Sequence, residues 1–312
     1  MRHLPPPVRD ALAAGWAARG LDQDGAAAVE LAGSPGSRRW RVTVGDTAYA
    51  VELGPPDSAG GLATALAAAA AGVPGVAAPV PTVDGTAHVA VAGRALSVVP
   101  WLDGVPAPEA RLGRAHWVAL GETLGRLHAL PVDGLPPVPQ PDPAALAARL
   151  EAVRRRVVAT RTGGAALGAL RDGLREHRRA LDRATRVLLT PRADRPLVAC
   201  HGDLHLRHVL LADDRPVLLG WWRAGAAARE RDLERLTGDG LGVHVGSEEE
   251  AWLTRGYGRV LAPDPDELAW QRTLRLVEAV VGPAEVALAG APDLGARLAA
   301  AGDATAALAA LG

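Results

Sequence analysis

The stretch Cys200-His201-Gly202-Asp203-Leu204-His205-Leu206-Arg207-His208 places three imidazoles, a carboxylate and the single thiol of the chain within nine residues. Apolar residues at 197–199 predict a strand that leads into it. Those at 209–211 and 217–219 predict a hairpin that follows it, with a turn at residues 213–216. The stretch is therefore predicted to be a loop held between strands.

Upstream of this loop, the pattern changes near residue 100. The first hundred residues predict a helix at 8–19, a hairpin of strands 40–44 and 47–53, a helix at 60–72, and strands 88–92 and 96–100. Residues 101–312 are mainly helical in pattern, with helices at 116–130, 144–158 and 167–189 and further helices after residue 248. We therefore predict an α+β fold with two lobes: a small antiparallel β-sheet lobe (1–100) and a larger helical lobe (101–312) that carries the loop 201–208.

Composition excludes several classes of function. The net charge of −1 gives no strong field for nucleic acid or an anionic membrane, so neither is expected as a partner. The one cysteine excludes an intramolecular disulfide. No apolar run is long enough to span a bilayer and the first residues lack a signal-peptide pattern, so we expect a cytoplasmic protein. All 34 basic residues are Arg, and Lys, Asn, Ile and Phe are absent, which indicates a high-GC bacterium.

An ordered set of motifs resembles the aminoglycoside/choline-kinase-type phosphotransferases, a family with a protein-kinase-like fold. Residues 201–208 match the family loop H-G-D-x-H-x-x-N except at the last position. Leu124–His128 is similar to the end of a family helix, Val99–Gly104 to the linker between lobes, and Tyr257-Gly258 to a late Tyr-Gly. Asp232-Leu233 stands at the family's Asp-Leu position. The resemblance extends over nearly the whole chain and implies the bilobal kinase-like fold.

The resemblance also implies roles for individual residues. Phosphoryl transfer depends on positioning and charge neutralisation. Asp203 is implied as the base that accepts the proton of a substrate hydroxyl. A structural frame for the loop is implied for four other residues: His201, Gly202, His205 and Asp232. In the family, an Asn in the loop and an Asp in a later motif hold Mg²⁺, and a strand Lys contacts the nucleotide phosphates.

The sequence departs from the family at these last positions. His208 replaces the Asn, Gly220 replaces the metal-binding Asp, and Glu52 occupies the place of the Lys. The helix at 62–71 lacks the acidic residue that would pair with that Lys. Codon bias can explain the loss of Lys and Asn, but it does not explain Gly220, because Asp is abundant here. Glu52 beside a triphosphate would replace attraction with repulsion of several kcal/mol, roughly, at a partly buried ~4 Å separation.

We therefore predict a pseudokinase-like protein that has lost conventional Mg–ATP transfer, with no certain cofactor. The cleft between its lobes is expected to bind a small molecule or a peptide. Alternatively, the chain is expected to bind a partner protein. The alternative is an active ATP-dependent O-phosphotransferase with altered metal ligation, Asp203 as base, and ATP and Mg²⁺ as cofactors. Whether the chain is an enzyme stays open.

Further interpretations concern the side chains around the loop. His205 and His208 are expected to be satisfied structural residues, with a His/His/Asp metal site together with Asp203 as the alternative. Cys200 is expected to be a small buried residue rather than a nucleophile. Trp222 is expected either to fill the vacated phosphate region or to stack on a ligand. The Gly-Ser loop at 33–38 occupies the place of the family's nucleotide-covering loop, where Arg38 and Arg39 can meet an anion.

Overall fold

The computed structural model describes residues 4–21, 26–31, 37–160, 164–236, 238–240, 243–258, 262–289 and 294–311. They form two compact units, one made of residues 1–139 with 196–262 and the other of residues 140–195 with 263–312. The boundary between lobes at residue 100 stays a prediction. The predicted loop at 33–38 lies outside the described residues except for Ser37 and Arg38.

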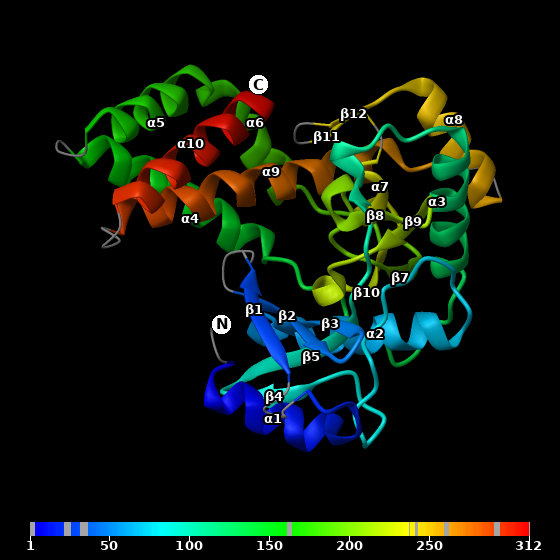
Figure 1. Cartoon of the computed structure of the whole chain (residues 1–312). Coiled ribbons are helices and arrows are strands. Elements are labelled where there is room, and N and C mark those ends of the chain that lie inside the picture. The colour runs from blue at the N-terminus through cyan, green and yellow to red at the C-terminus, as the bar shows by residue number, and fades with distance from the viewer. Residues whose placement is uncertain are drawn as a thin grey trace. The chain divides into compact units, whose positions relative to one another are not determined.

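The first unit contains a five-stranded antiparallel sheet (Figure 1). Its order is β1 (Ala27–Leu31), β2 (Arg38–Val44), β3 (Thr47–Leu53), β5 (Arg94–Pro100) and β4 (Val89–Val91). Helix α1 (Pro6–Trp16) packs against it and helix α2 (Ala59–Ala70) follows β3. This confirms the predicted sheet lobe, to which the structure adds β1.

Alternation along β2 separates the two faces of this sheet. Trp40 and Val42 are buried in the core with Val51 of β3, whereas their neighbour Arg39 is only partly buried. Because successive side chains of a strand point to opposite faces, Arg39 lies on the face away from that core. In the antiparallel register, Arg39 stands opposite Glu52.

The rest of the first unit surrounds the loop at residues 201–208, called the catalytic-type loop from here on. Its helices are α3 (Arg114–Leu127), α7 (Glu230–Leu233) and α8 (Ser247–Tyr257). Its strands are β6 (Val105–Pro106), β7 (Leu197–Cys200), β8 (Val209–Ala212), β9 (Arg215–Leu218), β10 (Gly225–Ala228), β11 (Gly238–Gly240) and β12 (Val243–Val245). Single 3₁₀ turns occur at Ala17–Arg19, Pro56–Ser58, Ala107–Glu109, Leu206–His208 and Trp221–Arg223. Strand β7 pairs with β10, and β8 pairs with both β6 and β9.

The predicted hairpin after the loop is confirmed as β8 and β9. Its two turn residues, Asp213 and Asp214, have φ of 47° and 59°. Positive φ at both central residues is typical of the tight turns that match the twist of a hairpin, and Asp tolerates this conformation. The hairpin carries the chain from His208 at the end of the loop to Gly220.

Helices α3 and α8 approach each other closely because small residues line the contact. A Cβ atom added at Gly121 or Gly125 of α3 would collide with the backbone of Leu253 or Tyr257. This approach brings His128, which follows α3, beside Tyr257 at the end of α8.

The second unit consists of helices (Figure 1): α4 (Pro143–Ala159), α5 (Gly164–Glu176), α6 (Arg178–Leu189), α9 (Pro265–Leu288) and α10 (Leu294–Leu311). The prediction of one helix over 167–189 was wrong, because the helix is interrupted at His177, between α5 and α6. The break allows Leu170 and Leu181 to enter the same apolar core. Asp142 and Asp264 cap α4 and α9 by accepting hydrogen bonds from backbone N–H groups of the first turn.

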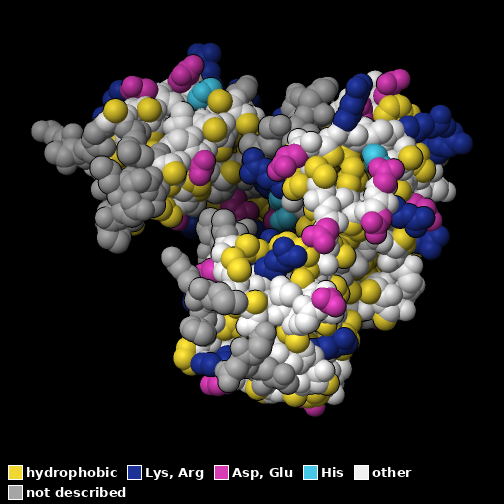
Figure 2. Space-filling view, in the orientation of Figure 1, with side chains coloured by type: hydrophobic (Ala, Val, Ile, Leu, Met, Phe, Trp, Pro, Cys, Tyr) yellow, Lys and Arg dark blue, Asp and Glu magenta, His cyan; other side chains and the backbone are white. Residues whose placement is uncertain are grey.

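Charged side chains of both signs are interspersed on the face shown in Figure 2, in keeping with the net charge of −1. Among the described helices, none has the length and hydropathy needed to cross a bilayer.

Candidate functional site

The catalytic-type loop connects the end of β7 to the start of β8 within the first unit. Gly202 has a φ of 81°, and a Cβ atom there would collide with the carbonyl oxygen of Arg223. Only glycine combines this conformation with so close an approach of two backbone segments. The carbonyl of Gly202 also accepts a hydrogen bond of 2.8 Å from Nε of Arg231. The loop backbone is therefore held from two sides.

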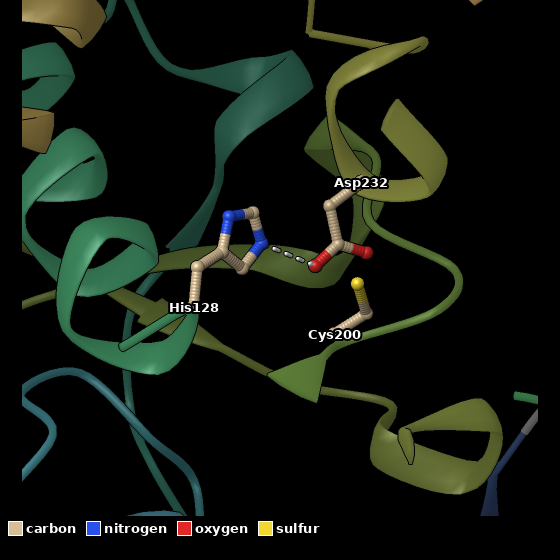
Figure 3. Close-up of side chains that lie close together, drawn as sticks. All are labelled: His128, Cys200 and Asp232. Carbon is tan, nitrogen blue, oxygen red and sulfur yellow. Dashed lines mark hydrogen bonds and ion pairs between the residues drawn. The ribbon is translucent and has the colours of Figure 1, made fainter. Parts of the chain in front are cut away.

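Asp232 anchors this loop from the start of α7. Its carboxylate is fully buried and accepts hydrogen bonds of 2.8 Å from the backbone N–H groups of His201 and Gly202. Nε2 of His128 lies 3.2 Å from the same carboxylate (Figure 3), and Nδ1 of His128 lies 2.8 Å from the Tyr257 hydroxyl. Burial by itself raises the pKa of Asp232, but the hydrogen bond from His128, nearby positive charge and the Gly202 N–H hold that pKa below its usual value.

The imidazole paired with Asp232 is thus that of His128, whereas the ring of His201 bonds to the carbonyl oxygen of Leu219 through Nε2 at 2.8 Å. Sequence reasoning assigned no bracing role to His128 or Tyr257. The Leu-His and Tyr-Gly motifs were the available signal for both. The arrangement supports the structural role predicted for His201, Gly202 and Asp232, which stays a proposal.

Cys200 lies beside this network (Figure 3) but has a different chemical character. Its side chain is fully buried, and its Sγ lies 3.8 Å from the carbonyl oxygen of Ala227 and 3.6 Å from that of Ala228. Burial and the Asp232 carboxylate raise the pKa of the thiol well above its usual value. His128, Cys200 and Asp232 are close enough to hold a metal ion. However, a protonated thiol and a carboxylate already bonded to three donors favour a structural cluster.

Asp203 occupies the position of the predicted base. Its side chain is 30 % exposed, and its Oδ1 lies 3.5 Å from Nη1 of Arg235. Burial raises the pKa of Asp203, but Arg235 and the neighbouring imidazoles outweigh this effect and lower that pKa. The carboxylate is therefore ionised at neutral pH. No sequence pattern pointed to Arg235.

His205 and His208 stack on each other, with ring centroids 4.0 Å apart and an angle of 25° between the rings. Nδ1 of His208 lies 2.9 Å from the carbonyl oxygen of Asp203. Burial, together with nearby positive charge, lowers the pKa of His205 to about 3 and that of His208 to about 4. Both rings are therefore neutral at pH 7. The structure thus brings together all three residues of the alternative metal site.

Gly220 and His208 are sterically linked. A Cβ atom at residue 220 would lie 2.8 Å from both Cδ2 and Nε2 of the His208 ring. Gly220 also has a φ of 74°, a conformation that favours glycine. The imidazole of His208 therefore fills the volume that a side chain at residue 220 would enter.

This arrangement does not suit Mg²⁺. That ion prefers octahedral coordination by oxygen ligands, and an imidazole and a glycine stand at the two positions to which the resemblance assigns its ligands. The side chains at these two positions therefore offer no oxygen ligand to Mg²⁺.

Glu52 points from β3 into the same region. It is 7 % exposed, and its Oε1 lies 2.5 Å from Nε of Arg39 on β2. The side chain of Trp222 donates a further hydrogen bond to it. Burial raises the pKa of Glu52, and the Arg39 charge and these hydrogen bonds only partly offset this effect. In α2, Ala59–Ala70 contains no acidic residue, as expected from the sequence.

A cavity of about 350 Å³ opens beside Arg39, Glu52 and Trp222, within the first unit. Its apolar wall includes Leu62, Val99, Trp101, Leu210, Leu219 and Trp222. Its charged lining consists of Arg39, Glu52 and Arg207. Gly220 also lines this cavity, so residues 52 and 220 face one pocket. Trp101 and Arg207 were not identified from sequence as lining residues, because nothing in their local pattern marks them.

A strand-rich lobe, a loop His-Gly-Asp and an adjoining pocket define a kinase-like phosphotransferase fold. The model of the phosphotransferase enzyme family matches residues 28–271, and the chain belongs to this family. This confirms the family and the α+β kinase-like fold inferred from the motifs. No curated protein matches the chain.

Solved structures give the same fold. Spectinomycin phosphotransferase, solved with ADP and spectinomycin, aligns with a TM-score of 0.77 at 17% identity, over 94% of this chain and 91% of its own. Aminoglycoside-3'-phosphotransferase of type VIII aligns with a TM-score of 0.51 at 26% identity, over 87% of this chain and 99% of its own. An aminoglycoside phosphotransferase from Alicyclobacillus acidocaldarius aligns with a TM-score of 0.56 at 17% identity, over 100% and 96%.

Proposed function

We propose that this phosphotransferase-family chain has lost conventional Mg–ATP phosphoryl transfer and acts as a pseudokinase-like binding protein. The single observation that carries the proposal is the His208 ring, whose Nε2 would lie 2.8 Å from any Cβ atom at residue 220. Two metal-holding positions of the family are thereby exchanged for one imidazole. The change is compensated sterically, which is expected of a site adapted to a different use.

The charge pattern of the pocket supports the same proposal. Glu52 brings a buried carboxylate to the place where the family has a phosphate-binding Lys, and Arg39 neutralises it at 2.5 Å. An Arg committed to such a pair has less of its charge available for a triphosphate. Trp222 interacts with the same carboxylate, so Glu52 has a second favourable partner besides Arg39.

The lining of the cavity suggests the class of ligand. Three tryptophans, Trp101, Trp221 and Trp222, and several aliphatic residues line a volume of about 350 Å³, which is within the usual range for small-molecule sites. A planar apolar group fits such a lining, with a polar substituent directed toward Arg207 or the Arg39–Glu52 pair. A small molecule or an inserted peptide side chain fulfils this description. A partner protein in a cytoplasmic setting is the broader form of the proposal.

Calorimetric titration with ATP, with and without Mg²⁺ or Mn²⁺, tests the loss of nucleotide chemistry. We expect no metal-dependent ATP binding in the wild type. The matched variant carries His208→Asn, Gly220→Asp and Glu52→Lys together, and we expect it to gain metal-dependent ATP binding. Saturable, metal-dependent ATP binding by the wild type would overturn the proposal.

The second candidate function is an active O-phosphotransferase with altered metal ligation. The observation that favours it is the ionised, 30 % exposed carboxylate of Asp203, which keeps the position of the family's base. If ATP is consumed in the presence of a hydroxyl-bearing acceptor, Asp203→Asn should lower the rate by at least about 100-fold, the usual size of a general-base contribution. An unchanged rate in that variant would remove Asp203 from the mechanism.

A further inference from the structure

Three side chains of the catalytic-type loop converge in a way that the binding function above does not use. One potential ligand atom from each of Asp203, His205 and His208 lies within 4.8 Å of the other two. In a tetrahedral site with bonds of about 2.0–2.1 Å, ligand atoms are about 3.3 Å apart. Each pair of atoms therefore needs to approach by at most about 1.5 Å (4.8 Å less about 3.3 Å) to reach one ion.

The hydrogen bond of the His208 ring selects the tautomer that can bind a metal ion. Nδ1 lies 2.9 Å from the carbonyl oxygen of Asp203, so this nitrogen carries the proton and donates it. Nε2 is left with its lone pair. Metal-binding histidines typically show this arrangement, in which the other ring nitrogen donates to a carbonyl or carboxylate and fixes the ring.

His205 adds an unsatisfied nitrogen. Its Nδ1 is shielded from solvent and has no hydrogen-bond partner among the described residues. A buried polar atom without a partner carries a free-energy cost, and a bound ion is one of the few ways to remove it. The stacking of the two rings at 4.0 Å keeps this atom close to His208.

We propose that Asp203, His205 and His208 form a binding site for a divalent transition-metal ion of the zinc or cobalt class. Two imidazoles and one carboxylate suit these ions, whereas Mg²⁺ and Ca²⁺ require oxygen ligands. The partial exposure of Asp203 gives the ion a route from solvent. Three protein ligands leave at least one position open for a ligand oxygen or a water molecule.

Arg235 is the neighbouring group that opposes the site. Its Nη1 lies 3.5 Å from Oδ1 of Asp203, so a bound ion replaces part of an existing ion pair. The proposal therefore requires binding to survive moderate salt, at which a purely electrostatic association with the exposed acidic groups would be screened.

Titration of the tag-free, chelator-treated full chain with Co²⁺ tests the proposal, with no nucleotide present. We expect one ion per chain and the visible absorption of nitrogen- and oxygen-ligated Co²⁺, removed by stoichiometric Zn²⁺. His205→Ala and His208→Asn should each weaken the binding by more than about tenfold, as should the nearly isosteric Asp203→Asn. His177→Gln, in the second unit, is the matched control and should leave it unchanged.

Absence of saturable Co²⁺ absorption in the wild type would overturn the proposal, whatever the variants do. Equal affinity for Co²⁺ in the wild type and Asp203→Asn would also overturn it, because that substitution removes the negative charge of the proposed ligand while the side-chain volume stays nearly the same. Circular dichroism of each variant separates loss of ligands from loss of folding. Since the titration contains no ATP, its result is independent of the test of nucleotide binding.

Discussion

Nε2 of His208 lies where it would be 2.8 Å from a Cβ atom at residue 220, so the loop and the segment after the hairpin constrain each other directly. We therefore propose that the two departures from the family pattern are one structural change. A side chain at residue 220 conflicts with the His208 ring, so we expect a larger residue at position 220 to require a smaller one at position 208.

The first prediction follows from this coupling. Gly220→Asp alone should lower the free energy of unfolding by about 1–3 kcal/mol, because of overpacking against the His208 ring and the positive φ. Adding His208→Asn should recover part of that loss. Urea denaturation of the two single variants and the double variant gives the coupling energy directly. Additive effects within about 0.3–0.5 kcal/mol would show that the two residues are independent.

The second prediction concerns Asp232 and pH. Asp232→Asn should cost about 2–5 kcal/mol, because His201 and Gly202 donate to different carboxylate oxygens and the amide NH₂ would face one of these two N–H groups. The pKa of Asp232 is lower in the folded state than in the unfolded chain. Its contribution is therefore fully present above about pH 4, near the unfolded value of about 3.9, and is lost as pH falls through the folded pKa.

Denaturation of both proteins across pH tests this sign. The difference in unfolding free energy between wild type and Asp232→Asn should stay constant from neutral pH down to about pH 5 and narrow below about pH 4. Asp133→Asn, at an exposed position, is the control and should change little at any pH. A difference that widens on acidification would contradict the lowered pKa.

The third prediction compares two neighbouring arginines of β2. Arg39→Ala leaves the buried Glu52 without its ion-pair partner and should cost about 1–3 kcal/mol. Arg38→Ala removes a more exposed pair with Glu30 and should cost at most about 1 kcal/mol. Thermal and urea denaturation of the two variants distinguish them. Equal losses would mean that the Glu52 pair contributes no more than a surface contact.

The fourth prediction concerns the chain's one thiol. Because Cys200 is fully buried and the pKa of its thiol is raised, an alkylating reagent should not modify the native protein at neutral pH. In denaturing urea the same reagent should modify one thiol per chain. Mass spectrometry after timed exposure measures both rates. Rapid modification of the native protein would show that the strand end opens locally.

Much of the architecture was predictable because it depends on local periodicity and on turn residues. Alternation at 40–44 and 47–53 correctly gave β2 and β3, and the Asp213–Asp214 turn gave the hairpin after the loop. The break at His177 was missed, because both flanking segments are amphipathic and share one apolar core. Strand β1 was missed because its short, mostly apolar sequence lies beside a segment rich in Gly and Ser.

The candidate site likewise contains residues assigned from sequence and residues found only in the structure. Asp203, His208, Gly220 and Glu52 were assigned to the candidate site from sequence, by their places in an ordered motif set, and their roles stay a prediction. The partners of these residues were not. Arg235 and Trp222 reach their carboxylates only through the packing of separate segments, and no local pattern encodes such a meeting.

By itself, the sequence determined the family and the α+β class, because these depend on residue order and spacing. The positions at which the phosphotransferase pattern is broken stay a prediction. The tertiary structure alone decided which distant residues meet around the loop. It paired His128 with Asp232 across 104 residues, placed the His208 ring in the space beside Gly220, and set Arg39 against Glu52. Such pairings depend on which buried polar atoms must satisfy one another when distant segments pack, and spacing along the chain does not specify them.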